Sequence, residues 1–341
     1  MSERVRAAIA TVMRGGRLTT DDAHAAMASV MDGEATAAQL SGLMLALRMR
    51  GETVDELTGF ARAMRERVVP VSAPDGAIDT CGTGGDGSQT FNISTAAALL
   101  VAAAGVPVAK HGNRAMSSAT GSADVLEALG IPIDHEADSA ASALANHGFV
   151  FLFAPTYHPA MRHAGPVRRE LGVPTAFNLL GPITNPAGVR RQVIGVADPT
   201  AAAKVANVLF RLGSERSLVV HGDGVDELPL DGTGVAYDVS RLGVRRRRVD
   251  SSALGLGVAS SADLRGGDAA QNAAIIEAVL CGETGPRRDV VLLNAAAALL
   301  VAGRVRRLHD GLVLAAATID GGRARGLLDL LRHARPQSSA A

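Results

Sequence analysis

Residues 79–122 read DTCGTGGDGSQTFNISTAAALLVAAAGVPVAKHGNRAMSSATGS and contain two glycine-rich polar segments, 82–95 and 110–122. The apolar run 93–105 predicts a helix between them. Consecutive main-chain amides in a glycine-rich turn form a concave anion site, and the N-terminus of a following helix adds partial positive charge. The second segment adds donors from lysine, histidine, asparagine and arginine. The stretch therefore predicts one anion-binding site, built from two turns that meet in space.

Two common nucleotide-binding motifs do not fit this stretch. Gly82, Gly84 and Gly87 satisfy the pattern G-x-G-x-x-G, but no acidic residue follows between Asp86 and Asp124, where a dinucleotide site would need one. A Walker loop ends in Gly-Lys-Ser/Thr, and the first segment has no lysine. A surface turn that binds nothing is the alternative for either segment alone, whereas the presence of both segments favours a site.

Five short motifs occupy the stretch: GTGGD at 82–86, NIST at 92–95, KHGNR at 110–114, SS at 117–118 and GSAD at 121–124. Together they resemble the anthranilate phosphoribosyltransferase family, and the resemblance extends over essentially the whole chain. Thr120 stands where the family usually has serine, and it keeps the hydroxyl. The related pyrimidine nucleoside phosphorylases share the fold but carry Lys-x-Ser-Gly-Arg in place of KHGNR.

The resemblance implies a reaction and its ligands. The chain would transfer the 5-phosphoribosyl group from phosphoribosyl pyrophosphate to the amine of anthranilate, giving N-(5-phosphoribosyl)anthranilate and pyrophosphate in tryptophan biosynthesis. The implied cofactor is Mg²⁺, with two ions expected, and the implied assembly is a homodimer through the N-terminal helices. The alternatives are a pyrimidine nucleoside phosphorylase and a non-enzymatic nucleic-acid-binding paralogue of the same fold.

The resemblance also assigns residues to three sites. Those implied for phosphoribosyl pyrophosphate are Gly82, Gly85, Asp86, Thr90, Asn92, Ile93, Ser94, Thr95, Lys110, His111, Gly112, Asn113, Arg114, Ala115, Met116, Ser117, Ser118 and Ser122. Those implied for anthranilate are Gly82, Asn113 and Arg168, and those implied for the metal are Ser94, Asp226 and Glu227. No catalytic general base is assigned, because the amine of an aniline is neutral near neutral pH and can attack without first losing a proton. Lys110 and Arg168 are expected to act through electrostatics and positioning.

The chemistry of two later segments fits these roles. Arg168 lies in a segment rich in Arg and His, 157–172, and a planar guanidinium can hold a carboxylate through two parallel hydrogen bonds. Asp226 and Glu227 follow a strand-like run, and adjacent carboxylates repel each other unless a cation or an arginine lies between them. Mg²⁺ prefers carboxylate oxygens, waters and substrate phosphates. Each segment alone is equally compatible with ordinary surface charge. The loop 177–186, FNLLGPITNP, is either a rigid connector or the family's loop beside the aromatic substrate.

The composition limits the possible functions. A formal net charge of +0 argues against a nucleic-acid or membrane-surface protein, and aromatic residues at 3% offer few platforms for base stacking. Cys81 and Cys281 are too few for a metal or disulfide framework and fit a reducing compartment. No apolar run reaches the roughly 20 residues that span a bilayer. We therefore expect a cytoplasmic protein with no nucleic-acid or membrane partner.

Apolar spacing divides the chain into two predicted domains. Residues 1–70 show helical spacing and predict a small all-helical domain, to which later helices could add. Residues 71–341 alternate short apolar runs with helices, which predicts an α/β domain with a mostly parallel central sheet flanked by helices. Strands are expected at 77–81, 106–109, 149–153, 192–196 and 217–221. Helices are expected at 93–104, 121–129, 138–147, 158–171, 200–212, 268–281, 288–302 and 322–334. A hairpin-like excursion is expected within 231–260, with the arginines at 245–248 in a solvated loop or edge strand.

Overall fold

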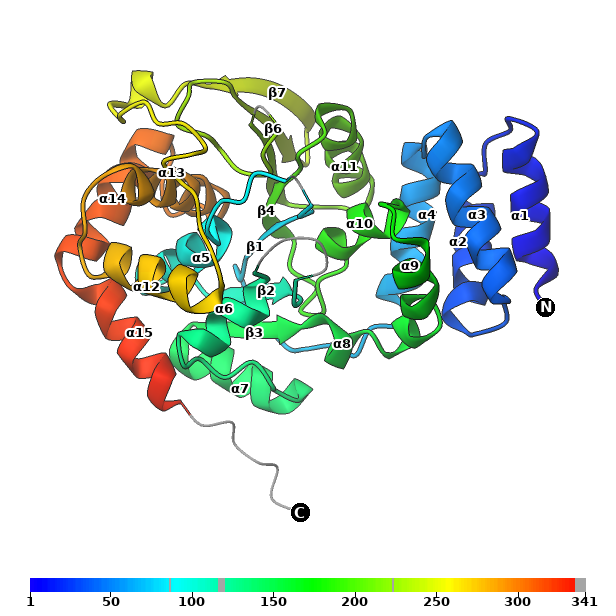
Figure 1. Cartoon of the computed structure of the whole chain (residues 1–341), viewed down its shortest axis with the longest axis horizontal. Coiled ribbons are helices and arrows are strands. Elements are labelled where there is room, and N and C mark those ends of the chain that lie inside the picture. The colour runs from blue at the N-terminus through cyan, green and yellow to red at the C-terminus, as the bar shows by residue number, and fades with distance from the viewer. Residues whose placement is uncertain (86, 116–119, 223, 335–341) are drawn as a thin grey trace, which may run out of the picture.

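The computed structural model describes residues 1–85, 87–115, 120–222 and 224–334. The helical region at the N-terminus consists of α1 (Glu3–Met13), α2 (Thr20–Met31), α3 (Ala37–Arg50) and α4 (Val54–Arg65). It lies at one end of the molecule, away from the sheet (Figure 1). Threonine caps begin three of these helices, because the side chains of Thr19, Thr36 and Thr53 accept main-chain N–H groups of the first turn.

A mostly parallel sheet forms the centre of the larger region. Its strands lie in the order β1 (Asp79–Gly82), β4 (Arg191–Gly195), β5 (Arg216–His221), β6 (Gly234–Ser240) and β7 (Gly243–Val249). The first three are parallel, and β6 and β7 form an antiparallel hairpin at the edge. A parallel pair, β2 (Val108–Gly112) and β3 (Phe149–Phe153), continues the surface beyond β1, where Ile78 bridges to Val108. The predicted fold class is confirmed, with one antiparallel edge added.

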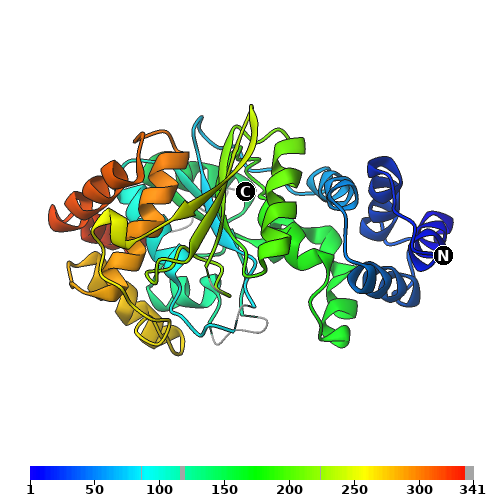
Figure 2. The same cartoon turned by 90° about the horizontal axis from the view of Figure 1, so that it is seen from above.

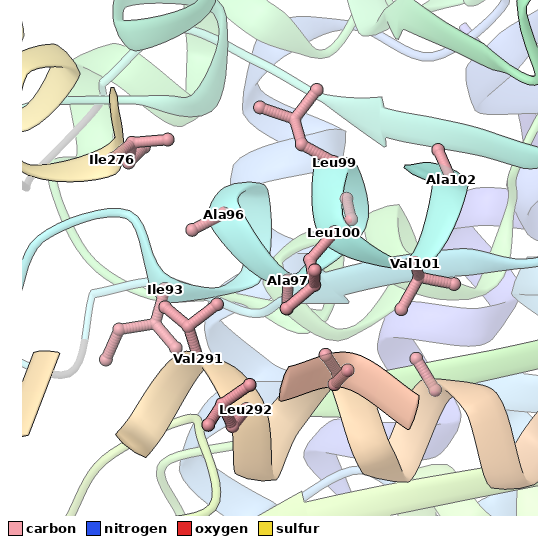
Figure 3. Packing of buried hydrophobic residues seen from close by; sticks show 14 of the residues in the cluster. Ile93, Ala96, Ala97, Leu99, Leu100, Val101, Ala102, Ile276, Val291 and Leu292 are labelled. Carbon is pink, nitrogen blue, oxygen red and sulfur yellow. The ribbon is translucent and has the colours of Figure 1, made fainter. Parts of the chain in front are cut away.

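Helices cover both faces of this sheet (Figure 2). On one face lie α5 (Ile93–Ala103) and α13 (Pro286–Val301), backed by α14 (Leu308–Asp320) and α15 (Arg323–His333). In Figure 3, Ile93 and Ala97 of α5 lie beside Val291 and Leu292 of α13 within the buried apolar cluster. On the other face, α11 (Pro199–Arg211) packs between β5 and α4. Because α5 is buried along most of its length, its N-terminus is held firmly against the carboxyl end of β1.

The remaining helices lie in the connections between strands or after the last strand. They are α6 (Ser122–Ala128), α7 (Ala137–His147), α8 (Ala154–Tyr157), η1 (Pro159–Arg162), α9 (Gly165–Leu171), α10 (Ala176–Leu180), η2 (Gly181–Ile183), η3 (Ser252–Leu254) and α12 (Ala269–Leu280). Apolar side chains of α9, α10 and α11 share one buried cluster with those of α1 to α4. The domain boundary at residue 70 therefore stays a prediction, since the helical region has no core separate from these later helices.

The structure corrects two local predictions and confirms a third. The single helix expected at 158–171 is broken into α8, η1 and α9, because Pro159 and Pro166 lack the N–H that a continuous helix needs and each stands at the start of a new element. The sequence reading missed α14, whose Gly311 lets the helix approach Ala296 of α13 so closely that a Cβ atom would lie 2.9 Å from the Cα of Ala296. The excursion within 231–260 is a regular hairpin of the main sheet. The arginines at 245–248 are exposed on its edge strand β7, as expected.

No helix within the described residues combines the length and apolar character that crossing a membrane requires.

Candidate active site

The two glycine-rich segments meet at the carboxyl ends of β1 and β2, as the sequence predicted. The first loop, 83–92, leads from β1 into α5, and the second loop, 113–121, leads from β2 into α6. Asn92 joins them, because its side-chain amide donates to the carbonyl oxygen of Thr120 over 3.2 Å. Gly84 and Gly85 have φ angles of 64° and 70°, a region that favours glycine and turns main-chain amides toward a shared concave side.

A third segment, 264–272, completes this framework, and sequence reasoning missed it. Asn272 donates through its side-chain amide to Asn92 Oδ1 over 3.0 Å and accepts from the main-chain N–H of Gly267 over 2.7 Å. The hydroxyl of Thr120 donates to the carbonyl oxygen of Gly267 over 2.9 Å. The only local signal is the pair Gly266-Gly267 before the capped start of α12, which gives no hint of its partners.

The same segment also fixes the middle of the first loop. The main-chain N–H of Gly266 donates to the carbonyl oxygen of Gln89 over 2.9 Å, and the N–H of Phe91 donates to the carbonyl oxygen of Leu264 over 3.1 Å. Thr90 lies in an antiparallel bridge with Arg265. Three segments distant in sequence therefore hold one another at the site.

The predicted metal residues lie together at the first loop. Asp226 Oδ2 accepts from the main-chain N–H of Gly84 over 2.8 Å, and Glu227 Oε1 accepts from the N–H of Ser94 over 3.1 Å. A Cβ atom on Gly82 would overlap the Asp226 carboxylate, and one on Gly195, at the end of β4, would overlap the main-chain carbonyl of Asp226. Two glycines therefore make room for the acidic pair, and the role of Gly195 was not foreseen.

The residues present fit a magnesium site. In the part of the chain that the structure describes, no three His, Cys, Asp or Glu side chains gather closely enough to hold a cation by themselves. Mg²⁺ commonly takes one or two carboxylates and completes its shell with waters and substrate phosphates. Asp226, Glu227 and the hydroxyl of Ser94 offer such a partial set of hard oxygen donors beside an anion-binding loop.

Lys110 is buried in the protein, whereas a lysine that binds phosphate at the surface would be exposed. Its side chain is buried, and Nζ donates to the carbonyl oxygen of Thr80 over 2.6 Å and to Ser94 Oγ over 3.4 Å. Burial lowers the pKa of Lys110, and the nearby carboxylate of Asp79 opposes this shift. The ammonium group therefore lies behind the N-terminus of α5, with the Ser94 hydroxyl between it and the first loop.

Ion pairs between charged side chains hold the second loop in place. Arg114 donates through Nη1 to Asp124 Oδ1 over 3.0 Å and through Nη2 to Glu127 Oε1 over 2.8 Å, and these carboxylates raise its pKa. Asp124 also accepts from the N–H of Ala115 over 3.0 Å. These contacts hold the loop against α6, and the assignment of Arg114 to the donor stays a prediction. Asn113 and Ser122 are joined across the loop, since Ser122 Oγ donates to the carbonyl oxygen of Asn113 over 3.3 Å.

Other predicted donor-site residues take supporting positions. Ile93 belongs to the buried apolar cluster. Thr95 Oγ1 is buried, with no hydrogen-bond partner among the described residues. Burial lowers the pKa of His111 to about 3, so its imidazole is neutral near neutral pH. The centroid of the His111 ring lies 5.0 Å from that of the His158 ring. A Cβ on Gly112 would overlap the hydroxyl of Ser122. Asp86, Met116, Ser117 and Ser118 lie outside the described residues.

Arg168 is a half-buried cation suited to an organic acid. It lies on α9, and its guanidinium carbon is 5.3 Å from the centre of the Phe177 ring on α10. Burial lowers the pKa of Arg168. No acidic side chain within the described ranges forms an ion pair with it. The following loop reaches β1 and β4, where Pro182 accepts from Gln192 Nε2 over 2.9 Å.

Comparison with known proteins first defines the class. Residues 74–325 match the family model described as "Glycosyl transferase family, a/b domain", and residues 6–68 match "Glycosyl transferase family, helical bundle domain". The two matches correspond to the α/β and helical regions described above. The fold is thus that of a glycosyl transferase built from a helical bundle and an α/β domain.

Individual relatives narrow the class. The anthranilate phosphoribosyltransferases of Moorella thermoacetica and Symbiobacterium thermophilum are each 52% identical to this chain, covering 96% of it and 97% of their own length. The crystal structure of the Thermus thermophilus enzyme superposes with a TM-score of 0.90 at 44% identity, covering 95% of this chain and 98% of that one. The Saccharomyces cerevisiae enzyme, solved in complex with PRPP and Mg, superposes with a TM-score of 0.86 at 26% identity. The match covers 96% of this chain and 97% of that one. The chain belongs to the anthranilate phosphoribosyltransferase family, which confirms the resemblance noted from its motifs.

Proposed function

We infer that this chain transfers the 5-phosphoribosyl group of phosphoribosyl pyrophosphate to the amine of anthranilate, releasing pyrophosphate, as a step of tryptophan biosynthesis. Family membership supports the reaction, and one observation in the structure carries it. The acidic pair Asp226–Glu227 contacts both the glycine-rich loop, at Gly84, and the N-terminus of α5, at Ser94. Carboxylates that suit a divalent cation therefore lie directly against a glycine-rich loop and a helix N-terminus, as a metal-bound diphosphate requires.

Each group has a distinct task in the proposed reaction. The glycine-rich first loop, next to the N-terminus of α5, would bind the pyrophosphate, and Ser94, Asp226 and Glu227 would hold Mg²⁺, with two ions proposed. When bound, Mg²⁺ supplies positive charge that stabilises the departing pyrophosphate. Lys110 adds a second, buried positive charge behind Ser94. Asn113, Gly82 and Arg168 would orient anthranilate so that its amine faces C1 of the ribose.

A continuous assay tests this function. Anthranilate is fluorescent, so its consumption can be followed with phosphoribosyl pyrophosphate and Mg²⁺ present, and with each omitted in turn. We expect loss of fluorescence only in the complete mixture, with one pyrophosphate released per anthranilate consumed. Phosphate-dependent cleavage of thymidine or uridine, with anthranilate untouched, would instead establish the pyrimidine nucleoside phosphorylase alternative.

We also propose that the protein is a homodimer whose subunits contact each other through the helical region. We propose that it works in the cytoplasm. α1 and α3 run side by side in the same direction, because Ser2 at the start of α1 donates to Gln39 at the start of α3 over 3.1 Å. Met13 and Met49, at the other end of these helices, are 75% and 88% exposed. Large apolar side chains exposed at one end of a helical region favour a protein partner. Neither cysteine forms a disulfide within the described residues, which suits a reducing compartment.

Disruption of this apolar face should separate the subunits. We expect the natural chain to sediment as a dimer and the Met13→Glu/Met49→Glu variant as a monomer, because two buried charges per subunit would destabilise the interface. Leu242→Glu is the matched control, since Leu242 is 90% exposed on the β6–β7 turn, away from the helical region. A monomeric natural chain, or a double variant that remains dimeric, would rule out this interface.

A further inference from the structure

The strands β1 and β2 begin as an ordinary parallel pair and then separate. Ile78 donates to the carbonyl oxygen of Pro107 over 2.9 Å and accepts from the N–H of Ala109 over 2.9 Å. In a parallel ladder, the next pair of bonds would join Thr80 to Ala109 and His111. Instead, the N–H of His111 donates to the side chain of Asp79, at Oδ1, over 3.2 Å. The ladder therefore stops at Ile78 and Val108, before β1 ends at Gly82 and β2 ends at Gly112, where the two site loops begin.

Side chains occupy the places that the next pair of bonds would have used. Asn185 Nδ2 donates to the carbonyl oxygen of Ala109 over 2.8 Å, and Lys110 Nζ donates to the carbonyl oxygen of Thr80 over 2.6 Å. Asn185 Nδ2 also donates to Asp79 Oδ2 over 2.8 Å. Asp79 and Asn185 are thus hydrogen-bonded to each other between the strands, with the buried side chain of Lys110 nearby, and we call these three side chains the wedge.

The wedge is costly as a purely structural device. Asp79 is 0% exposed and Lys110 is 1% exposed, and the removal of two charges from water opposes folding even when they attract each other. The ordinary ladder would have satisfied the same main-chain groups without any buried charge. What the wedge adds is separation of the carboxyl ends of β1 and β2, from which the first and second loops project.

We propose that Asp79 and Asn185 are positioning residues that set the spacing between the two loops for the phosphoribosyl donor. This inference rests on the proposed function, because it takes the donor to bridge both loops. Asp79 reaches the second loop through the N–H of His111, two residues before Asn113. Asn185 comes from the loop after α10 and fixes itself by accepting from the N–H of Ala187 over 2.8 Å. Neither side chain needs to touch the donor.

Two variants separate spacing from charge. Asp79→Asn keeps the size of the side chain but presents an NH₂ group either to the amide of Asn185 or to the N–H of His111, so one contact of the wedge must fail. Asn185→Ala removes the uncharged amide side chain of Asn185 and keeps the Asp79 carboxylate. The matched control is Glu56→Gln, which neutralises another fully buried carboxylate, in the helical region, where it accepts from the N–H of Leu18 over 2.9 Å.

The measurements are calorimetric binding of phosphoribosyl pyrophosphate with Mg²⁺, the KM for anthranilate, and the melting temperature. We expect both wedge variants to weaken donor binding by about tenfold or more, because small displacements of binding groups have large effects, while the anthranilate KM changes by less than about threefold. Glu56→Gln should lower the melting temperature but leave donor affinity within about twofold.

The outcomes distinguish this proposal from the function itself. If the natural chain does not bind the donor, the proposed function fails. If the natural chain binds and both wedge variants bind equally well, the positioning role is wrong. Weakened binding in Asp79→Asn alone would show that charge acts, not spacing, and would overturn the proposal. An equal loss of donor affinity in Glu56→Gln would show that the effect comes from general instability, and this result would also overturn the proposal. Should Asp79→Asn fail to fold, Asn185→Ala decides between these results.

Discussion

Replacing Asp226 with Asn and Glu227 with Gln together is expected to lower kcat/KM by about 1000-fold, through loss of charge stabilisation at the leaving group. The amide side chains can still accept from the N–H groups of Gly84 and Ser94, so the first loop should keep its place. What disappears is the pair of negative charges that would hold Mg²⁺. The measurement is activity against Mg²⁺ concentration, in which the variant should require far more Mg²⁺ for half-saturation.

A matched pair of adjacent acids provides the control. Asp21 and Asp22 lie in the exposed first turn of α2. Asp21→Asn/Asp22→Asn removes the same charge from the helical region and should leave both activity and Mg²⁺ dependence near their natural values. A metal titration of the Asp226/Glu227 variant that superimposes on that of the natural chain would show that these carboxylates do not bind the ion.

Arg168→Ala should raise the KM for anthranilate by roughly 100-fold, since a charge-assisted bidentate contact contributes more than an ordinary hydrogen bond. The half-buried guanidinium stacks on Phe177, which restricts it to a narrow range of orientations. The KM for the phosphoribosyl donor should change by less than about threefold, because Arg168 lies on α9 and not on either loop. Steady-state kinetics with each substrate varied in turn gives both constants.

Two neighbouring variants sharpen this prediction. Arg168→Lys keeps the charge but loses the planar fork, so it should recover only part of the anthranilate affinity. Arg169→Ala removes the adjacent exposed arginine and should leave both KM values unchanged. Equal increases in both KM values for Arg168→Ala would mean that the residue stabilises the site in general and does not select the acid.

The sequence predicted what depends on local chemistry. The glycines at 82–87 indicated a turn with exposed amides, and the apolar run after Asn92 indicated the helix that follows it. The turn and the helix each need only a short window of sequence, in which residue type and spacing fix the backbone. The acidic pair at 226 and 227 was different, because its assignment to a metal came from the resemblance to the family and not from its local pattern.

Contacts between distant segments could not be predicted in this way. Nothing near Asn272 indicates that its amide meets Asn92, and nothing near Gly195 indicates that Asp226 will lie against it. Arg114 was assigned to the donor site through the resemblance, and nothing near it in the sequence indicates that its side chain meets Asp124 and Glu127 on α6. Such contacts depend on how distant segments pack in the folded chain, and a short stretch of a single sequence does not indicate this packing.

The bonds between Asn92 and Asn272, and between Gln89 and Gly266, have a consequence for biosynthesis of the polypeptide. During translation, both glycine-rich turns emerge from the ribosome early, before the residues that join them have been synthesised. The nascent chain can acquire its complete catalytic pocket only after residue 272 of 341 has been added and has left the exit tunnel. Truncated products that end before this point would therefore contain every motif of the family and still be inactive.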